Sequence, residues 1–353
     1  MTIFVSTDWL AAELGAPDLV ILDASLFLPG TPRDPRAEFE AAHIPGAAYM
    51  DLPTLNDPND PVPGMLPPDA MMTQRAQALG IHPDNRIIVY DNSPTHSAAR
   101  GWWMMRVYGL GADRGRGAAI LDGGLPKWVA EGRAVESGPV SPAPGTAIAR
   151  LDRSQVRTKA DLIANLASGD AQVIDARGAA RFTGAEAEPR PGMASGHIPG
   201  SRNLPSSALF DADNRMKQGN ELRRLFVEAG TDFDRPVITS CGSGVTAAIL
   251  LAGLETLGKT DVSLYDGSWS EWGFDPGTPK ATGARARTRL TGTCIRFVFV
   301  GTCRPSCVRA TDHASGSEAA LPPERWAPST ARRRRDRPLR TGYPMRGKPA
   351  ARA

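Results

Sequence analysis

The chain has 353 residues, of which 41 are Lys or Arg and 38 are Asp or Glu, so its formal net charge is +3. This length leaves room for two domains with cores of their own. Residues 281–353 hold 16 basic and 4 acidic side chains, net +12, and the chain totals therefore leave 25 and 34, net −9, for residues 1–280. An acidic body gives no reason to expect nucleic acid as a partner. The first residues lack a basic flank and a long apolar core, so we expect a cytoplasmic protein without membrane contact.

Motifs of the first half of the chain recur in the second half. Val20–Ala24 returns as Gln172–Ala176, and His43–Gly46 returns as His197–Gly200, at spacings of 152 and 154 residues. Such spacings predict two tandem domains of ordinary size. We place a first domain at 1–135, a Pro/Gly-rich linker at 136–150, a second domain at 151–280 and a basic, disordered tail at 281–353.

Short apolar runs alternate with helical segments in each half. In the second half the predicted strands are 173–175, 237–240 and 262–265, and the predicted helices are 159–167, 221–229 and 244–257. The alternation predicts an α/β fold in which each domain is a parallel sheet flanked by helices. Ligands of such sheets bind at the carboxyl ends of the strands, which is where Cys241 falls.

Laying residues 87–90 over residues 237–240 places Asp91 opposite Cys241. The first domain therefore lacks the cysteine, and we expect it to wall the site and stabilise the second domain. His43 and His197 occupy the same motif in both halves, including the half without the cysteine, so we interpret both as structural.

Cys241 opens the loop Gly242-Ser243-Gly244-Val245-Thr246, which lies between a predicted strand and a predicted helix. The N–H groups of such a loop and the positive end of the helix favour a thiolate or an anionic sulfur carried on it. Small side chains let the backbone close around that sulfur. We predict a nucleophile that accepts a group and passes it on, cradled by residues 242–246. A cysteine phosphatase is disfavoured, because the position of its phosphate-clamping arginine holds Ala247.

Arg181 and Arg190 bracket a Gly-rich, acid-containing loop. Two arginine forks near one cysteine suit a small keto acid, because a guanidinium pairs well with a planar carboxylate. We interpret Asp175 and Arg177, a few residues earlier, as an ion pair that organises this loop.

Several motifs together resemble the 3-mercaptopyruvate sulfurtransferases of the two-domain rhodanese superfamily. The resemblance covers about residues 1 to 275 and includes 102–104, 175–177, 196–200, 241–247 and 266–273. It implies that Cys241 takes the sulfur of 3-mercaptopyruvate as a persulfide, with release of pyruvate. It also implies that Arg181 and Arg190 hold the carboxylate and carbonyl of the donor, and that neither a metal nor an organic cofactor is needed.

One departure concerns the serine-protease-like triad of that family, in which Ser243 would work with a histidine and an aspartate of the first domain. The expected histidine position holds Gly64, and the expected aspartate position holds Pro53, with Asp51 two residues before it. We therefore assign Ser243 only a hydrogen bond to the sulfur or carbonyl of the donor.

Two alternatives stay open: thiosulfate:cyanide sulfurtransferase, and a non-catalytic sulfur carrier or scaffold. The first is disfavoured because Gly242 and Ser243 are neutral, whereas a doubly charged donor favours basic residues after the cysteine. The expected acceptors are a low-molecular-weight thiol, a reduced thioredoxin-like protein or cyanide.

The segment after residue 281 differs in composition from the rest of the chain. We interpret it as a frame-shifted or read-through extension, because the resemblance ends abruptly there; an unbroken frame preserved on resequencing would contradict this. Its three cysteines, Cys294, Cys303 and Cys307, lack a fourth ligand at zinc-finger spacing, so we expect no metal. Cys241 is the one cysteine of residues 1–280, which leaves no disulfide there and suits a reducing compartment.

Overall fold

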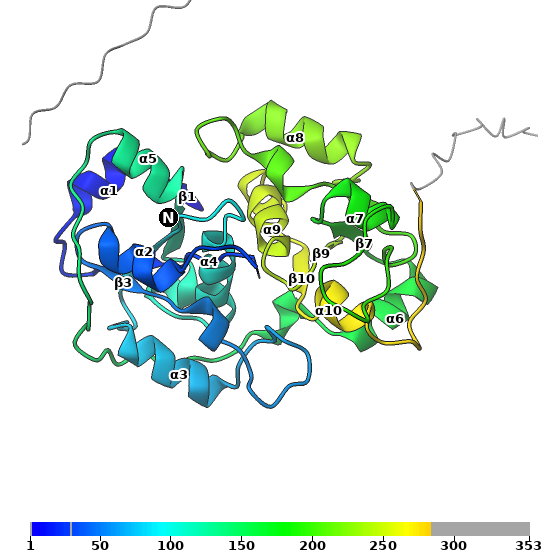
Figure 1. The fold of residues 1–353 in the computed structure, drawn as a ribbon, viewed down its shortest axis with the longest axis horizontal. Helices are drawn as coiled ribbons and strands as arrows, with labels where there is room; N and C mark the ends of the chain where they lie inside the picture. The colour runs from blue at the N-terminus through cyan, green and yellow to red at the C-terminus, as the bar shows by residue number, and fades with distance from the viewer. Residues whose placement is uncertain (1, 29, 284–353) are drawn as a thin grey trace, which may run out of the picture. The chain divides into compact units, whose positions relative to one another are not determined.

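The computed structural model describes residues 2–28 and 30–283 of the chain. These residues form two halves of matching topology, which run from blue to teal and from green to yellow in Figure 1. The first half contains β1 (Phe4–Val5), α1 (Thr7–Glu13), β2 (Leu19–Asp23), α2 (Pro35–Ala41), β3 (Ala47–Tyr49), α3 (Asp69–Ala78), β4 (Arg86–Tyr90), α4 (Ala98–Val107), β5 (Ala118–Leu121) and α5 (Gly124–Ala130).

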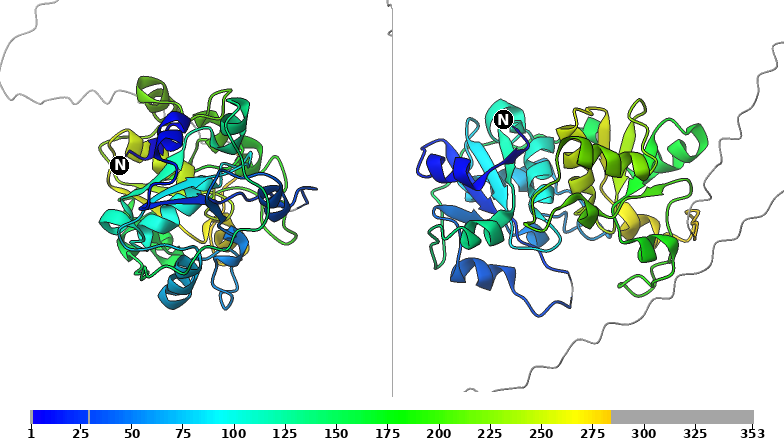
Figure 2. Two further views of the ribbon diagram at one scale, coloured as in Figure 1. Left: turned by 90° about the vertical axis from the view of Figure 1, so that its left-hand side faces the viewer. Right: turned by 90° about the horizontal axis from the view of Figure 1, so that it is seen from above.

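The second half repeats this order of elements after the segment 131–155. It contains β6 (Val156–Arg157), α6 (Lys159–Ser168), β7 (Gln172–Asp175), α7 (Ala179–Thr183), β8 (Arg202–Asn203), α8 (Gly219–Glu228), β9 (Val237–Ser240), α9 (Ala247–Thr256), β10 (Val262–Tyr265) and α10 (Ser268–Trp272). The two halves lie side by side in Figure 1 and in the right-hand view of Figure 2.

Each half is built on a five-stranded sheet in which every pairing is parallel. The strand orders are β1-β5-β4-β2-β3 and β6-β10-β9-β7-β8, so β4 and β9 occupy the same central place. The α/β prediction is confirmed, and β9 and β10 have the predicted bounds. The helix after Cys241 begins at Ala247 instead of residue 244, because Gly244 has a φ of +74°, which a right-handed helix does not allow.

Side chains of the central strand β4 alternate between two apolar clusters, as strand geometry requires. Ile87 and Val89 face a cluster that includes Trp102 and Trp103 of α4, whereas Ile88 and Tyr90 face α2 and α5. Helices therefore cover both faces of the sheet, and a parallel sheet needs this cover.

The cluster around α4 continues into the second half through α9. Leu250, Leu251 and Leu254 of α9 are at most 1% exposed, and α4 packs directly against α9. Full burial of a leucine side chain contributes about 1.5–3 kcal/mol, so this shared core fixes the two halves against each other.

His43 and His197 play the same part in the two halves. Each ring stacks on a phenylalanine, Phe39 or Phe182, with centroids 4.1 and 3.9 Å apart, and each Nδ1 lies 2.7–2.8 Å from that residue's carbonyl oxygen. Both histidines thus close loops, which fits the structural role that their recurrence predicts.

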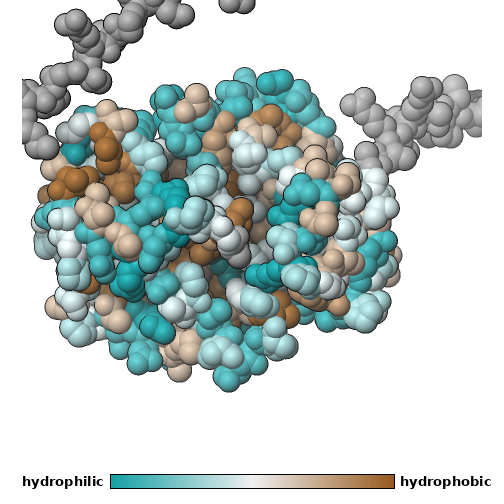
Figure 3. Space-filling view, in the orientation of Figure 1, coloured by the Kyte–Doolittle hydropathy of each residue, from teal (hydrophilic) through white to brown (hydrophobic). Residues whose placement is uncertain are grey.

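Residues 281–283, assigned to the tail by sequence, are held in the described fold, since Ala281 pairs with His197 through two backbone hydrogen bonds of 2.8 and 2.9 Å. The rest of the predicted tail, with Cys294, Cys303 and Cys307, lies outside the described residues. Within the described ranges, no helix combines the length and apolar composition that a membrane crossing needs. The face in Figure 3 is mostly hydrophilic, with apolar side chains in small separate groups.

Candidate active site

Cys241 stands at the carboxyl end of β9, where the fold predicts a ligand site. The residue is 1% exposed. Its N–H donates to Ser268 Oγ at 3.1 Å, and the same Oγ lies 4.0 Å from Cys241 Sγ. Ser268 has a φ of +48°, rare for a non-glycine residue, and donates its hydroxyl to Tyr265 O at 2.8 Å. Ser268, the first residue of α10, therefore contacts the thiol.

The carbonyl groups of the loop after Cys241 are bound by α10. Trp269 donates its backbone N–H to Cys241 O at 3.0 Å, and Ser270 donates its backbone N–H to Gly242 O at 2.8 Å. Because the C=O and the N–H of a trans peptide point in opposite directions, the N–H groups of residues 242 and 243 point away from α10. Among the residues that the structure describes, no acceptor is found for the N–H groups of residues 242–245. This run of unpaired donors beside a cysteine can hold an anion.

Gly244 of the loop is fixed by a buried ion pair from both halves. Arg100 of α4 and Asp266 lie 2.8 Å apart, with side chains 4% and 2% exposed, and Arg100 Nη1 also donates to Gly244 O at 3.4 Å. A Cβ on Gly244 would stand 2.9 Å from Arg100 Nη1, so only glycine fits at this positive φ. The loop conformation thus depends on a cation supplied by the first half.

Arg181 is directed toward the loop by a buried carboxylate. Arg181 Nη2 binds Glu188 at 2.5 Å and lies 3.4 Å from where a Cβ on Gly242 would be. The Glu188 side chain is fully buried and also binds Arg177 at 2.6 Å, and Arg177 binds Asp175 at 2.7 Å. The predicted pair of Asp175 and Arg177 is confirmed, and it is the inner part of a chain of charges that ends at Arg181.

Arg190 reaches the same loop by another route. Its Nη1 donates to Ser270 Oγ at 3.0 Å, and Ser270 Oγ donates to Gly242 O at 2.7 Å. Arg181 and Arg190, nine residues apart along the chain, thus both converge on Gly242. Both arginines are partly exposed, which the predicted contact with a donor requires.

Ser243 and Gly64 are brought together from the two halves. A Cβ on Gly64 would have Ser243 O as its nearest neighbour, at 3.7 Å. Gly64 also accepts a hydrogen bond from Arg100 Nη2 on its carbonyl oxygen, at 3.0 Å. The position where the family would place a histidine is therefore next to the loop, and it carries no side chain in this protein.

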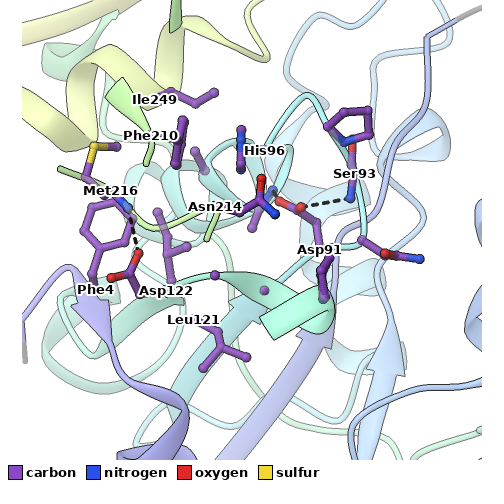
Figure 4. Close-up of a pocket in the computed structure, with 18 of the residues that line it drawn as sticks. Phe4, Asp91, Ser93, His96, Leu121, Asp122, Phe210, Asn214, Met216 and Ile249 are labelled. Carbon is purple, nitrogen blue, oxygen red and sulfur yellow. Dashed lines mark hydrogen bonds between the residues drawn. The ribbon is translucent and has the colours of Figure 1, made fainter. Parts of the chain in front are cut away.

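The matching position of the first half, Asp91, borders a cavity of about 240 Å³ (Figure 4). Asp91 accepts the N–H groups of Ser93 at 3.0 Å and Ala98 at 2.6 Å, and burial raises its pKa to about 7. His96 stacks on Phe210 across the cavity with centroids 3.5 Å apart, and burial lowers the pKa of His96 to about 4. No cysteine is among the residues that line this cavity.

Sequence reasoning named the cysteine, its loop and both arginines, and the structure gathers them at the end of β9. It missed the residues that hold them, which are Arg100, Glu188, Asp266, Ser268 and Ser270. One signal was present for Glu188, because an acid between two arginines that are predicted to bind the donor is placed to bind one of them. Arg100 contacts residues that are far from it in the chain, so no local sequence pattern could predict these contacts.

The rhodanese-like domain model matches the chain twice, over residues 6–131 and 158–274. The chain is 41% identical over 274 residues to 3-mercaptopyruvate sulfurtransferase of Homo sapiens, covering 76% of this chain and 91% of that protein. It is 41% identical over 296 residues to thiosulfate/3-mercaptopyruvate sulfurtransferase 1, mitochondrial, of Arabidopsis thaliana, covering 78% of this chain and 77% of the other.

Among solved structures, the chain is similar to SseA from Escherichia coli, a crystal structure described under the rhodanese fold and catalytic mechanism of 3-mercaptopyruvate sulfotransferases. The TM-score is 0.69 at 38% identity, over 76% of this chain and 99% of that chain. The second match to the domain model includes the Cys241 loop. The chain therefore belongs to the rhodanese family, as a protein with two rhodanese-like domains.

Proposed function

We infer that this protein is a 3-mercaptopyruvate sulfurtransferase that carries sulfur as a persulfide on Cys241. The observation that carries this proposal is the run of unpaired N–H groups at residues 242–245, which adjoins both the cysteine and two convergent arginines. A single anionic sulfur needs donors of this kind, and a keto acid needs the arginines.

In the first half-reaction, the Cys241 thiolate attacks the sulfur of 3-mercaptopyruvate. The S–S bond forms as the C–S bond breaks, and the electron pair of the C–S bond passes to the enolate of pyruvate. The proton that the donor thiol loses balances the one that the methyl group of pyruvate gains. Arg181 and Arg190 bind the carboxylate and carbonyl, which orients the sulfur toward Cys241 and favours the departing enolate.

In the second half-reaction, the outer sulfur of the persulfide passes to an acceptor thiolate and Cys241 leaves as a thiolate. Until then the loop 242–246 holds the persulfide anion through its N–H groups. The proposed acceptors are a low-molecular-weight thiol or a reduced thioredoxin-like protein in the cytoplasm, where thiols stay reduced. Ser243 is assigned a hydrogen bond to the donor, since no histidine stands at Gly64 to activate it.

Thiosulfate is the second candidate donor, favoured by the name of the Arabidopsis relative. Thiosulfate carries two negative charges and has no carbonyl. The side chains directly after Cys241 are neutral, and each arginine is already bound to one neighbour, Glu188 or Ser270. This arrangement favours the singly charged keto acid.

The test is steady-state release of pyruvate and sulfide with dithiothreitol as acceptor, comparing 3-mercaptopyruvate with thiosulfate. A strong preference for 3-mercaptopyruvate that disappears in Cys241→Ser is expected. A preference for thiosulfate would transfer the assignment to the second candidate. Turnover of neither donor by the folded protein would contradict both, and would favour a non-catalytic sulfur carrier.

A further inference from the structure

The hydroxyl of Ser270 joins the donor site to the nucleophile loop. Ser270 lies in α10 and is 4% exposed. Its Oγ accepts a hydrogen bond from Arg190 Nη1 at 3.0 Å and donates one to Gly242 O at 2.7 Å. The Ser270 backbone N–H donates to the same carbonyl oxygen at 2.8 Å. A single buried atom therefore links an arginine to the residue that follows Cys241.

The two arginines of the site differ in how they are held. Arg181 is bound by the buried carboxylate of Glu188, whereas Ser270 is the one side chain that binds the guanidinium of Arg190 within the described residues. A long side chain that is partly exposed loses much rotamer freedom when it meets a ligand. The hydrogen bond to Ser270 already restricts the rotamers of the Arg190 side chain. Arg190 is therefore oriented before the donor arrives.

The link also acts on the loop. Donation from a guanidinium polarises the Ser270 hydroxyl and strengthens its bond to Gly242 O, because hydrogen bonds in a chain reinforce one another. That bond holds the peptide between residues 242 and 243, whose N–H points away from α10. The orientation of Arg190 and the orientation of this N–H are thus coupled through one oxygen.

We propose that Ser270 is a positioning residue which couples donor recognition by Arg190 to the sulfur-binding conformation of the Cys241 loop. The proposal rests on the proposed function and deepens it. Ser270 acts through Arg190 and Gly242 and does not itself touch the reacting sulfur.

The test uses the full chain and the variant Ser270→Ala, with Arg190→Ala and the double variant. In Ser270→Ala, kcat/KM for 3-mercaptopyruvate is expected to fall about tenfold, the effect of losing one hydrogen bond to a charged group, with a raised KM. In the Arg190→Ala background, the same substitution is expected to change kcat/KM much less. Ser270→Thr, which keeps the hydroxyl, is expected to recover most of the loss.

Ser201→Ala is the matched control. Ser201 is 1% exposed, lies in the same half and donates its hydroxyl to a backbone carbonyl, Ile198 O, at 2.7 Å, and within the described residues it makes no hydrogen bond to the loop. This variant is expected to match the unsubstituted protein in KM. Equal effects of Ser270→Ala and Ser201→Ala, or fully additive effects of Ser270→Ala and Arg190→Ala, would overturn the proposal.

A second measurement separates this proposal from the proposed function. Cys241 is alkylated with iodoacetate, which carries a carboxylate, and with neutral iodoacetamide. An oriented Arg190 favours the anionic reagent, so Ser270→Ala is expected to slow iodoacetate several-fold and to leave iodoacetamide nearly unchanged. If 3-mercaptopyruvate is not turned over at all, the proposed function fails, while an unaltered ratio of the two alkylation rates in Ser270→Ala would refute the role of Ser270.

Discussion

The loops that follow β4 and β9 stand at the same place in two matching sheets, but they differ in whether their backbone N–H groups have acceptors. In the first loop the carboxylate of Asp91 accepts the N–H groups of Ser93 and Ala98. In the second, the N–H groups of residues 242–245 find no acceptor among the described residues. The first loop carries its own internal acceptor, whereas the second leaves these donors available for the anionic sulfur that we propose. The same scaffold thus has a closed turn in one half and a loop with unpaired donors in the other.

The contacts between the halves also differ at matching positions. Asp122 after β5 accepts the N–H of Met216 at 2.8 Å, and Asp266 after β10 accepts the N–H of Leu66 at 2.7 Å. Each half therefore receives a backbone bond from the other. Asp266 forms an ion pair with Arg100, whereas Asp122 forms no ion pair within the described residues and interacts with Arg215 only at longer range.

The third residue of α4 is Arg100, and the third residue of α9 is Ile249, which lines the cavity beside Asp91. The arginine of α4 thus forms a close ion pair in the half that holds the cysteine, and α9 has no arginine at the matching position.

The largest effect on sulfur transfer is expected from Cys241→Ser. Turnover of 3-mercaptopyruvate should fall on the order of a thousandfold or more, as happens when a covalent nucleophile is removed. Unfolding by urea should change little, because the substitution is nearly isosteric. Substantial residual turnover in this variant would mean that the second loop is not where the reaction occurs.

Glu188→Gln should weaken both stability and donor binding. The substitution leaves Arg177 without one of its buried carboxylates, which is expected to lower the free energy of unfolding by about 3–5 kcal/mol. It also removes the ion pair that orients Arg181, so KM for 3-mercaptopyruvate should rise about tenfold. The same substitution at Glu228, in an exposed pair with Arg224, is the control and should cost less than about 1 kcal/mol. Similar unfolding midpoints for the two variants would show that the buried carboxylate of Glu188 stabilises the fold no more than the exposed carboxylate of Glu228 does.

Asp91→Asn should leave turnover unchanged and alter the pH dependence of stability. Burial raises the pKa of Asp91 from 3.8 to about 7. Between these two pH values the carboxyl group is mostly protonated in the folded protein and mostly ionised in the unfolded chain. Stability of the unsubstituted protein relative to the variant should therefore fall as pH rises from about 4 to about 7, by up to about 4 kcal/mol, and then level off. Urea unfolding of both proteins across this range checks it, and a difference that is constant with pH would contradict the assignment.

The smallest effect on sulfur transfer is expected from placing a cysteine in the first loop. In the double variant Asp91→Cys with Cys241→Ser, sulfide release should stay at the level of Cys241→Ser alone. Beside residue 91 the described residues place one arginine, Arg33, which donates to Asn92 O at 3.2 Å, whereas two arginines converge on Gly242. A single guanidinium is expected to orient a keto acid poorly. Recovery of donor-dependent turnover would show that the second loop differs from the first only in its cysteine.

Much of this fold follows from local pattern, because the strands around Cys241 are short apolar runs bounded by turn residues. The start of α9 was predicted too early, since the positive φ of Gly244 depends on Arg100 and Asp266, which lie far away in the chain. The nucleophile and both arginines could be named from residue types and spacing. Ser268 and Ser270 could not be assigned roles, because a serine carries no signal until the fold brings its hydroxyl to Cys241 or Gly242.

The most direct test of the central claim is the mass of the protein after reaction with 3-mercaptopyruvate in the absence of any thiol acceptor. If Cys241 carries the sulfur as a persulfide, the peptide that contains Cys241 gains one sulfur atom, which is released as sulfide when dithiothreitol is added. An unmodified Cys241 peptide in a preparation that releases pyruvate, or sulfur carried on a peptide with Cys294, Cys303 or Cys307 instead, would contradict it.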